Sequence, residues 1–348
     1  MADDWPFVSI IVPVYNGSRT IDALLSSLLE LDYPANRHEI LIVDNKSTDG
    51  TRERVQRYPV TLLEETEIQG SDAARNRGVE AAKGEILAFT DADCVVEPTW
   101  LKRLLANHEE LHWGGFSGST RAYPSSNLIA RYCAHAKVLD LSLQQKSLFQ
   151  PDGMGERLCS RISVLDYRSH ISSPTGLFNP PTTNVAYRRV VFEKIGYFDQ
   201  KMLPTGGDFD LAWRLQTQTD WQIAIVPDAV VYHQHRENLA GFTSMYRSYG
   251  GGYAILALKY SSDSERTARQ LMVGGLVIMA LTIPAHLLKV LMLPVKAIGR
   301  CPDALFWSEP ILGLMASFYY NYGKADVAQR WLIGESLNAT LQSTCKRK

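Results

Sequence analysis

The first 120 residues alternate between apolar runs that suit strands and amphipathic stretches that suit helices. Residues 8–14 are almost all apolar and rich in β-branched side chains, as in strands that are buried on both faces. Residues 20–31 carry apolar side chains at helical spacing, which predicts an amphipathic helix. The same criteria predict strands over 39–43, 60–63 and 85–90, and helices over 71–82 and 98–105.

The order of these elements predicts the fold class. Short links between alternating strands and helices favour a parallel, twisted sheet with helices on both faces. We therefore expect an α/β fold with a largely parallel sheet. Ligands of such sheets bind at the carboxyl ends of the strands, so functional residues should collect at one edge.

Two carboxylates follow the strand predicted over residues 85–90. Asp91 and Asp93 are separated by one residue, and side chains two apart on an extended chain point to the same side. Paired carboxylates at a strand end suit Mg²⁺ or Mn²⁺, bound directly or through water. The alternative is a solvated turn, a position that aspartate favours.

Composition narrows the class of protein. The chain has 348 residues, 45% of them hydrophobic, and a net charge of -1, which allows a large core and argues against a dedicated nucleic-acid binder. Its five cysteines are scattered without a Cys-x-x-Cys pair, which predicts a reducing compartment and no zinc site. Asp3 and Asp4 precede the first apolar run without a basic leader, so we expect no cleaved secretion signal.

Candidate nucleotide-binding residues lie near the same edge of the predicted sheet. No Gly-x-Gly-x-x-Gly motif follows the first strand and no Walker lysine motif occurs, so the two commonest phosphate-binding loops lack support. Asp44 ends the second predicted strand and is able to accept a hydrogen bond from a base or ribose. Arg75 and Arg77 are able to neutralise a diphosphate. The alternatives are an ordinary turn aspartate and a solvated basic helix face.

Six segments of the chain form a recognisable series. Four occur in order as VSIIVPVYN (8–16), IVDNKSTDGT (42–51), ARNRG (74–78) and FTDADC (89–94). Two more follow, TTNVAYRRVVFEKIGYFD (182–199) and GGDFDLAWRL (206–215). Together they resemble glycosyltransferase family 2, a group of nucleotide-sugar enzymes with the GT-A fold, and the resemblance covers residues 7–240. It implies an α/β fold with a Rossmann-like sheet that is mixed but mostly parallel, with helices on both faces.

The resemblance implies roles on the donor side. Asp44 would recognise the nucleoside, and Asp91 and Asp93 would serve the metal-bound diphosphate. The donor site implied in this way consists of Pro13, Tyr15, Asn16, Asp44, Arg75, Arg77, Asp91 and Ala92.

On the acceptor side, the resemblance makes Asp208 the general base. In many relatives this aspartate follows a glutamate, whereas Gly207 stands in that position here, so one expected polar contact is missing. Asp210 and Arg214 fit the same segment, and their first role is expected to be structural.

Two histidines alternate on a strand-like run near residue 233. Imidazole is an acceptable Mn²⁺ ligand beside carboxylates, and the resemblance favours His233 over His235. The predicted metal set is therefore Asp91, Asp93 and His233, holding Mn²⁺ or Mg²⁺. The alternative is a histidine that hydrogen-bonds a loop or faces water.

These residue types suit sugar transfer. Breaking the bond between an anomeric carbon and a diphosphate builds negative charge on the leaving oxygens and oxocarbenium character on the sugar. A divalent metal offsets the negative charge as a Lewis acid, and a carboxylate on the opposite side takes the proton of the attacking hydroxyl. Asp208 fits that task. Attack from behind predicts inversion without a covalent nucleophile.

The predicted organisation has two parts. Residues 1–240 form the catalytic domain, divided into nucleotide-sugar binding (1–120), a variable insertion (121–176) and an acceptor and base segment (177–240). The insertion is expected to shape the acceptor pocket, to rest near a membrane, or to belong to the core. Residues 241–348 form a helical region that is expected to associate with a membrane.

The membrane prediction comes from charge and length. Residues 271–288 carry no formal charge and approach the length of a bilayer span. Basic residues flank them on both sides, which favours a shallow or re-entrant helix pair with the second apolar stretch, 304–322. The alternative is a buried helical hairpin that packs on the catalytic domain.

We therefore interpret the sequence as a metal-dependent, inverting hexosyltransferase on the cytoplasmic side of a membrane. A UDP-sugar is the preferred donor, and the acceptor is a glycan or lipid-linked glycan in cell-surface polysaccharide or glycoconjugate synthesis. No nucleic-acid partner is expected. The alternatives are a polyprenyl-phosphate glycosyltransferase and a catalytically silent membrane scaffold with the same fold.

Overall fold

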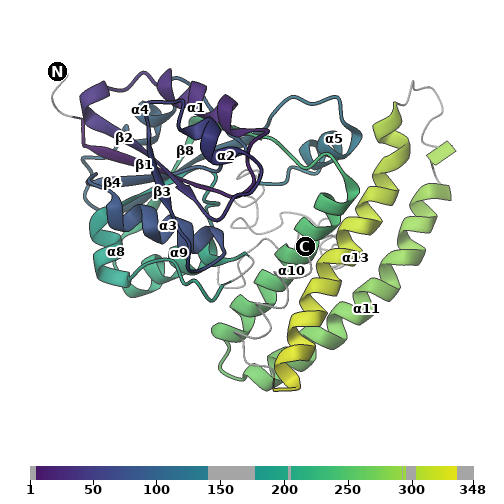
Figure 1. Cartoon of the computed structure of the whole chain (residues 1–348). Helices are drawn as coiled ribbons and strands as arrows, with labels where there is room; N and C mark the ends of the chain where they lie inside the picture. The colour runs from purple at the N-terminus through teal and green to yellow at the C-terminus, as the bar shows by residue number, and fades with distance from the viewer. Residues whose placement is uncertain (1–4, 140–176, 203–204, 292, 295–302, 335–348) are drawn as a thin grey trace.

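The computed structural model describes residues 5–139, 177–202, 205–291, 293–294 and 303–334. Figure 1 shows a sheet domain beside three long helices that come from the carboxyl-terminal part of the chain. The described part of the predicted insertion ends at residue 139, and the remainder, up to 176, lies outside the described residues.

A single mixed sheet forms the centre of the first domain. Its strands are β1 (Val8–Val14), β2 (His38–Asp44), β3 (Thr61–Glu64), β4 (Ile86–Phe89), β5 (Cys94–Val96), β6 (Trp113–Ala122), β7 (Val185–Arg188) and β8 (Gln222–His233). In the described residues their order is β3-β2-β1-β4-β7-β6-β8-β5. Only β7 and β5 run against the other strands of this sheet. The sheet is therefore mixed and mostly parallel, which confirms the predicted fold class.

Each face of the sheet packs against helices through its own apolar cluster. The helices of this domain are α1 (Ile21–Leu29), η1 (Ala35–Arg37), α2 (Thr51–Val55), α3 (Ser71–Ala81), α4 (Trp100–Leu104), α5 (Leu128–His135), α8 (Arg189–Ile195) and α9 (Gly207–Gln218). Ile10 of β1 belongs to the cluster that includes α1, α2 and α4, whereas Ile11 belongs to the cluster that includes α3, α8 and α9. Both side chains are fully buried, because an apolar central strand loses both faces to the core.

Every element predicted within the first 120 residues is present, with its boundaries shifted by no more than a residue or two. One difference affects the acidic pair. Strand β4 ends at Phe89, and the backbone N–H of Cys94 donates to the carbonyl of Asp91 over 3.0 Å. Asp91 and Asp93 therefore lie on a tight turn and not on a continued strand, so their separation by one residue does not by itself place them on one face.

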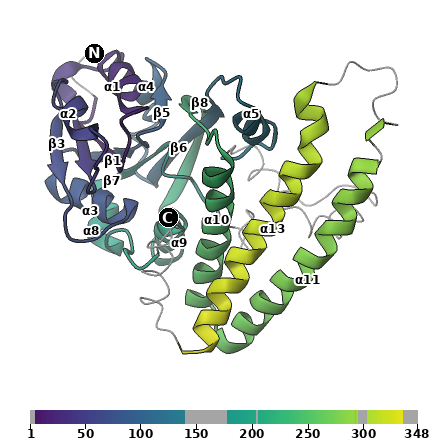
Figure 2. The same ribbon diagram turned by 45° about the vertical axis from the view of Figure 1, so that its right-hand side comes forward.

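Three helices pack together after residue 238. They are α10 (Leu239–Lys259), α11 (Ser264–Leu291) and α13 (Ala304–Leu332), and Figure 2 shows α13 between α10 and α11. Glycines allow α10 and α13 to approach closely. A Cβ atom on Gly250 would lie less than 3.0 Å from the Tyr320 carbonyl oxygen, and one on Gly323 equally close to that of Arg247. Any side chain at these glycines would force the helices apart.

The bundle of α10, α11 and α13 also packs against the sheet domain. Trp213 of α9 shares an apolar cluster with Ile255 of α10 and Val327 of α13. Tyr132 of α5 shares another with Phe242 of α10. The helical region is therefore held by the same kind of apolar packing that stabilises the core of the sheet domain.

One helix of the described residues is long and apolar enough to cross a membrane, judged by length and composition alone. It covers Ser264–Pro284 of α11, and 28% of its most apolar window is buried. Leu276 and Leu281 are about half exposed, at 53% and 52%. Core helices of soluble proteins meet the same two criteria, so this finding is compatible with both interpretations drawn from the sequence.

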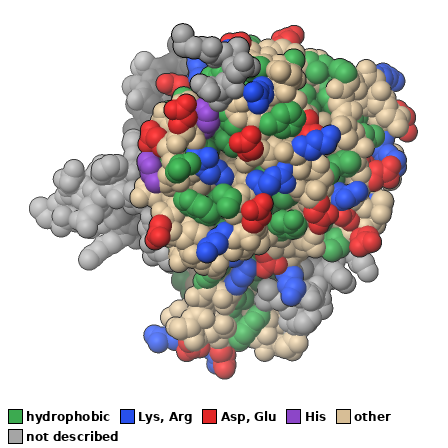
Figure 3. All heavy atoms as spheres, turned by 90° about the vertical axis from the view of Figure 1, so that its left-hand side faces the viewer, with side chains coloured by type: hydrophobic (Ala, Val, Ile, Leu, Met, Phe, Trp, Pro, Cys, Tyr) green, Lys and Arg blue, Asp and Glu red, His purple; other side chains and the backbone are tan. Residues whose placement is uncertain are grey.

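The distribution of charged side chains on the surface agrees with the small net charge of the chain. On the face of the molecule shown in Figure 3, basic and acidic side chains are interspersed, as expected for a chain with a net charge of -1. Cys94 and Cys133 fall within the described part of the chain, where both are buried and free.

Candidate functional site

The candidate site lies where neighbouring parallel strands end. Strands β2, β1 and β4 are adjacent and parallel, so the segments that follow them meet at one edge of the sheet. The loop after β1 touches the turn after β4, since a Cβ atom on Gly17 would lie 3.6 Å from the Cβ of Ala92. The sheet therefore brings together three of the donor-side segments that the sequence singles out.

The loop after β1 is tied to the loop after β2. The backbone N–H of Asn16 donates to Ser47 Oγ over 2.9 Å, and the Asn16 side-chain oxygen accepts from the backbone N–H of Thr48 over 2.8 Å. Pro13 is buried within β1, whereas the Tyr15 side chain is 56% exposed. Tyr15 is thus accessible to a ligand, and Asn16 acts chiefly within the protein.

Asp44 has a buried acceptor that no described residue satisfies. Its Oδ2 atom accepts from the backbone N–H of Ser47 over 3.1 Å, whereas Oδ1 is buried without a hydrogen-bond partner. The residue is 2% exposed. A buried acceptor without a partner is costly, and an N–H or O–H group of a bound nucleoside would remove that cost. This geometry fits the predicted role of Asp44.

Arg75 links helix α3 to the acidic turn. Its Nη1 atom donates to Asp72 Oδ1 over 3.0 Å, and Nη2 donates to Asp91 Oδ1 over 2.9 Å. The side chains of Arg75 and Asp72 are 7% and 5% exposed, and that of Asp91 is 25% exposed. Asp91 therefore keeps an accessible part while one of its oxygens is held by a buried guanidinium.

Arg77 is not brought to this site. It lies two residues further along α3, about 200° around the helix axis from Arg75. Its guanidinium pairs with Glu80 at 3.8 Å, and its side chain is 45% exposed. A contact between Arg77 and a diphosphate beside Asp91 would need another arrangement of this helix.

Strand pairing brings His233 to Asp93. Strands β5 and β8 pair in antiparallel register with Cys94 opposite His233. As a result, His233 Nε2 lies 3.3 Å from Asp93 Oδ1, and Arg236 Nη1 lies 3.6 Å from Asp93 Oδ2. The backbone N–H of Gln234 donates to the Asp93 carbonyl over 2.8 Å. The turn is thus fixed to the end of β8.

The second histidine is buried behind the first. The rings of His233 and His235 have centroids 5.0 Å apart, and His235 is 7% exposed. Desolvation, together with the neighbouring His233, lowers the pKa of His235 to about 3. His235 is therefore neutral in the folded protein and contributes no charge to the site.

The pair formed by Asp93 and His233 fits a divalent cation. Carboxylate oxygen and imidazole nitrogen both suit Mn²⁺, and the two groups lie side by side, with His233 Nε2 3.3 Å from Asp93 Oδ1. His233 Nδ1 is buried without a partner. The described residues contain no group of three or more acidic, histidine or cysteine side chains arranged for a metal. The predicted set of Asp91, Asp93 and His233 is therefore not assembled as a trio there, and Asp91 is bound by Arg75.

Asp208 stands in the first turn of α9, after the left-handed Gly206, whose φ is 113°. Its Oδ1 atom accepts from the backbone N–H of Phe209 over 3.0 Å, and the residue is only half-buried. Desolvation raises the pKa of Asp208, the negative charge of Asp91 raises it further, and the positive charge of Arg75 opposes both. Asp208 is therefore close enough to the acidic turn to respond to its charges.

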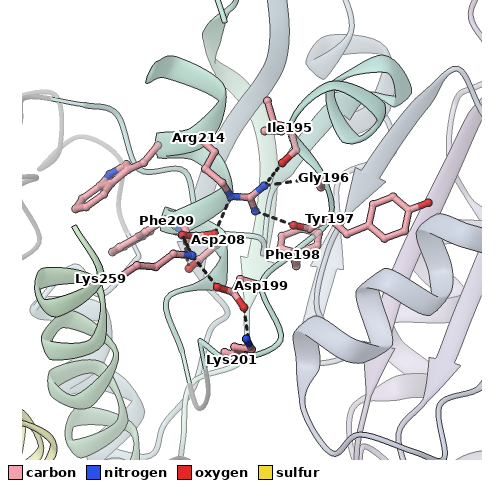
Figure 4. Close-up of polar contacts among 12 residues, drawn as sticks. Ile195, Gly196, Tyr197, Phe198, Asp199, Lys201, Asp208, Phe209, Arg214 and Lys259 are labelled. Carbon is pink, nitrogen blue, oxygen red and sulfur yellow. Dashed lines mark hydrogen bonds and ion pairs between the residues drawn. The ribbon is translucent and has the colours of Figure 1, made fainter. Parts of the chain in front are cut away.

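Asp210, two residues further along α9, lies in a buried ionic cluster. It accepts from Arg214 Nε over 2.9 Å, from Lys259 Nζ over 2.6 Å and from the Tyr260 hydroxyl over 2.7 Å. Lys259 also donates to Asp199 over 2.6 Å. Figure 4 shows the Arg214 guanidinium directed at the backbone carbonyls of Ile195, Gly196 and Tyr197. The expected structural role of Asp210 and Arg214 agrees with these contacts.

Two residues near the site were not found from the sequence. Asp72 contacts Arg75 from one helical turn away, and an acid three residues before an arginine on a helix was the available signal. Tyr249 of α10 is half-buried, and its pKa is raised by desolvation and by the charges of Asp208 and Asp93, with Arg236 opposing. No pattern in the sequence points from α10 to the sheet edge.

Comparison with known proteins relates the chain to glycosyltransferases. The family model described as Glycosyl transferase family 2 matches residues 9–196. Glycosyltransferase AglE of Haloferax volcanii is 44% identical over 108 residues, which are 30% of this chain and 36% of that protein. The pre-mycofactocin glycosyltransferase of Mycobacterium tuberculosis is 26% identical over 284 residues, which are 77% of this chain and 50% of that protein. The chain thus spans between about a third and a half of these two relatives.

A solved structure shares the fold. The mannosyltransferase PcManGT from Pyrobaculum calidifontis, in complex with GDP-Man and Mn²⁺, superposes with a TM-score of 0.55 at 18% sequence identity. The match covers 90% of this chain and 87% of that chain. It therefore includes the helical region as well as the sheet domain.

Proposed function

The chain belongs to glycosyl transferase family 2, and on that basis we propose that it transfers a sugar from a nucleotide-sugar donor to a glycan or lipid-linked glycan acceptor. The observation that carries this proposal is the contact between Arg75 and Asp91, 2.9 Å long. The same guanidinium binds Asp72, whose carboxylate lies against Gly207, the residue before Asp208. Charged groups from three separate segments gather where the ends of the parallel strands meet.

Each of these residues has a task in the proposed reaction. The free Oδ1 atom of Asp44 accepts a hydrogen bond from the nucleoside. Asp208 takes the proton of the acceptor hydroxyl as that hydroxyl attacks the anomeric carbon, a contribution of about 10²–10⁴-fold for a positioned base. Its raised pKa strengthens it as a base, and its partial exposure leaves room for the acceptor. A single displacement of this kind inverts the anomeric configuration.

The proposal includes Mn²⁺ or Mg²⁺, with Asp93 and His233 as its ligands from the protein and Asp91 close to it. When bound, the ion would offset the negative charge on the departing diphosphate. The 3.3 Å separation of the two ligand atoms supports this assignment. Arg75 holds Asp91 in the orientation in which its accessible part faces the donor.

A UDP-sugar is the proposed donor, with a GDP-sugar as the competing choice. We place the protein at the cytoplasmic face of a membrane, where α11 and its half-exposed Leu276 and Leu281 would contact lipid. Synthesis of a cell-surface polysaccharide or glycoconjugate is the proposed context.

The test begins with a panel of nucleotides and nucleotide-sugars. We expect the full chain to bind a nucleoside diphosphate in calorimetry only when Mn²⁺ or Mg²⁺ is present. We also expect it to release the nucleoside diphosphate from one of the nucleotide-sugars in the panel. The configuration of the transferred sugar, read by NMR, should be inverted. Nucleotide binding that is unchanged by a chelator would contradict the proposed role of the metal. Retention of the anomeric configuration would contradict a single displacement.

The same panel separates the alternatives. A polyprenyl-phosphate glycosyltransferase would transfer to a polyprenyl phosphate in preference to glycans. A silent scaffold would release no diphosphate with any donor or acceptor, and that result would overturn the proposed function.

A further inference from the structure

The carboxylate of Asp72 occupies the place that a side chain at position 207 would need. We propose that Asp72 is a positioning residue, which orients Arg75 toward the acidic turn and supports the start of helix α9. This inference rests on the function proposed above, because Arg75 and α9 carry parts of the proposed site.

The space around Gly207 is the first observation. A Cβ atom built on Gly207 would lie less than 3.0 Å from Oδ1, Oδ2 and Cγ of Asp72, closer than a real Cβ atom approaches atoms to which it is not bonded, so something would have to shift. The backbone does not demand glycine here, since the left-handed residue is the preceding Gly206, with a φ of 113°. Glycine at 207 is therefore explained by the Asp72 carboxylate beside it.

The contacts of Asp72 are the second observation. Its Oδ1 atom accepts from Arg75 Nη1 over 3.0 Å, while Nη2 of the same guanidinium donates to Asp91 over 2.9 Å. A planar guanidinium that is held by two carboxylates has its orientation fixed. Without Asp72, the Nη1 atom of Arg75 would lose its hydrogen-bond acceptor, and the guanidinium would be free to rotate away from Asp91.

The charge of Asp72 is costly to the folded state. Desolvation raises the pKa of Asp72 to about 6, and the charges of Asp208 and Asp210 raise it further while Arg75 opposes them. A buried acid with a perturbed pKa and a specific charged partner, beside other candidate site residues, is a candidate for a role in that site. The two contacts of the carboxylate, with Arg75 and with the start of α9, supply the reason to keep it.

The test compares substitutions at the two positions by the turnover of a nucleotide-sugar, with UDP-glucose, UDP-N-acetylglucosamine and GDP-mannose as probes in the presence of Mn²⁺. We expect Asp72→Ala to lower kcat by about 10²-fold, the loss typical of misplaced reacting groups, and the melting temperature of the same variant at pH 7 reports any loss of stability separately. Asp72→Asn, which keeps the shape, should lower kcat as well. Asp32→Ala, at an exposed acid paired with Lys102, is the matched control and should leave kcat unchanged.

Double variants distinguish the negative charge of the Asp72 carboxylate from the volume that it fills beside residue 207. Gly207→Ala alone should destabilise the protein because its Cβ meets Asp72, and Asp72→Ala/Gly207→Ala should recover stability without recovering kcat. Asp72→Ala/Gly207→Glu returns a carboxylate to the vacated space and should recover kcat to within about tenfold of the unaltered chain. A purely structural Asp72 would predict recovery by both doubles.

Three results would overturn the inference. Unchanged kcat in Asp72→Ala and Asp72→Asn would show that the carboxylate positions nothing. Equal recovery in the two double variants would reduce Asp72 to a space-filling role. If the unaltered chain turns over no probe, the proposed function and this inference fail together, whereas an active chain with an unaffected Asp72→Ala refutes the inference alone.

Discussion

At the scale of single residues, Asp44 combines its proposed binding role with a cost to folding. Its Oδ1 atom is buried without a partner. We expect Asp44→Ala to weaken binding of the nucleotide by about 10- to 100-fold, which corresponds to the 1.5–3 kcal/mol of a hydrogen bond to a charged group. The unfolding free energy should stay level or rise, because a costly buried acceptor is removed. Calorimetry and urea unfolding would measure the two effects, and a parallel loss of both would show that Asp44 serves the fold.

Asp72 gives the pH dependence of stability a definite sign. Its pKa is raised to about 6, above the value near 4 of an unfolded chain, so the folded state binds the proton more tightly. The contribution of Asp72 to the free energy of unfolding is fully present below pH 4 and is lost as the pH rises through 6. It amounts to on the order of 2–3 kcal/mol in total. In Asp72→Asn, we expect the unfolding free energy to fall less between pH 4 and pH 7, because this titrating group is absent. Urea unfolding between pH 4 and pH 7 would show it, and identical slopes for both proteins would contradict it.

The sequence identified most of the candidate residues but not their partners. Asp44, Asp91 and Asp208 were found because they follow strands or belong to recognisable motifs. Asp72 was not, because its spacing to Arg75 on α3 indicates only a helical ion pair, and its burial against a glycine far along the chain leaves no local pattern. The pairing of His233 with Asp93 likewise depends on the register of β5 and β8, which hydrophobic periodicity does not specify.

At the scale of elements, Asp210 joins helix α9 to helix α10. It is fully buried and accepts hydrogen bonds from Arg214 and Lys259. We expect Asp210→Asn to lower the unfolding free energy by about 3–5 kcal/mol, because two cations then lose their buried counter-charge. Urea unfolding checks this value. Glu265→Gln, which breaks the exposed pair with Arg269, is the control and should cost at most about 1 kcal/mol; equal effects would refute the role of Asp210.

Strands and helices were predicted more completely than their arrangement. The apolar run of β1 and the spacing within α1 contain enough local information to locate them. The reversal of β7 between β4 and β6 does not follow from local patterns, because side-chain alternation is the same in parallel and antiparallel strands. The turn after β4 is the alternative that the sequence left open for Asp91 and Asp93, since aspartate favours turns.

At the scale of the whole molecule, the helical bundle both packs on the sheet domain and exposes apolar side chains. Leu276 and Leu281 of α11 are 53% and 52% exposed. We expect the full chain to sediment with vesicles of mixed zwitterionic and anionic lipids, and Leu276→Glu/Leu281→Glu to lower the bound fraction at least tenfold, because charges are costly in the apolar layer. Removal of the bundle is a poorer test, since α10 and α13 cover Trp213. A chain that stays in solution with every vesicle would contradict the membrane proposal.

The central claim is that Asp208 acts as the base at a donor site built by Asp44, Arg75 and Asp91. It is tested most directly by measuring donor binding and diphosphate release together for Asp208→Asn. The account predicts binding within about threefold of the unaltered chain and release of the diphosphate lowered by at least about 10²-fold. Release at the rate of the unaltered chain, with the donor bound equally well, would contradict it.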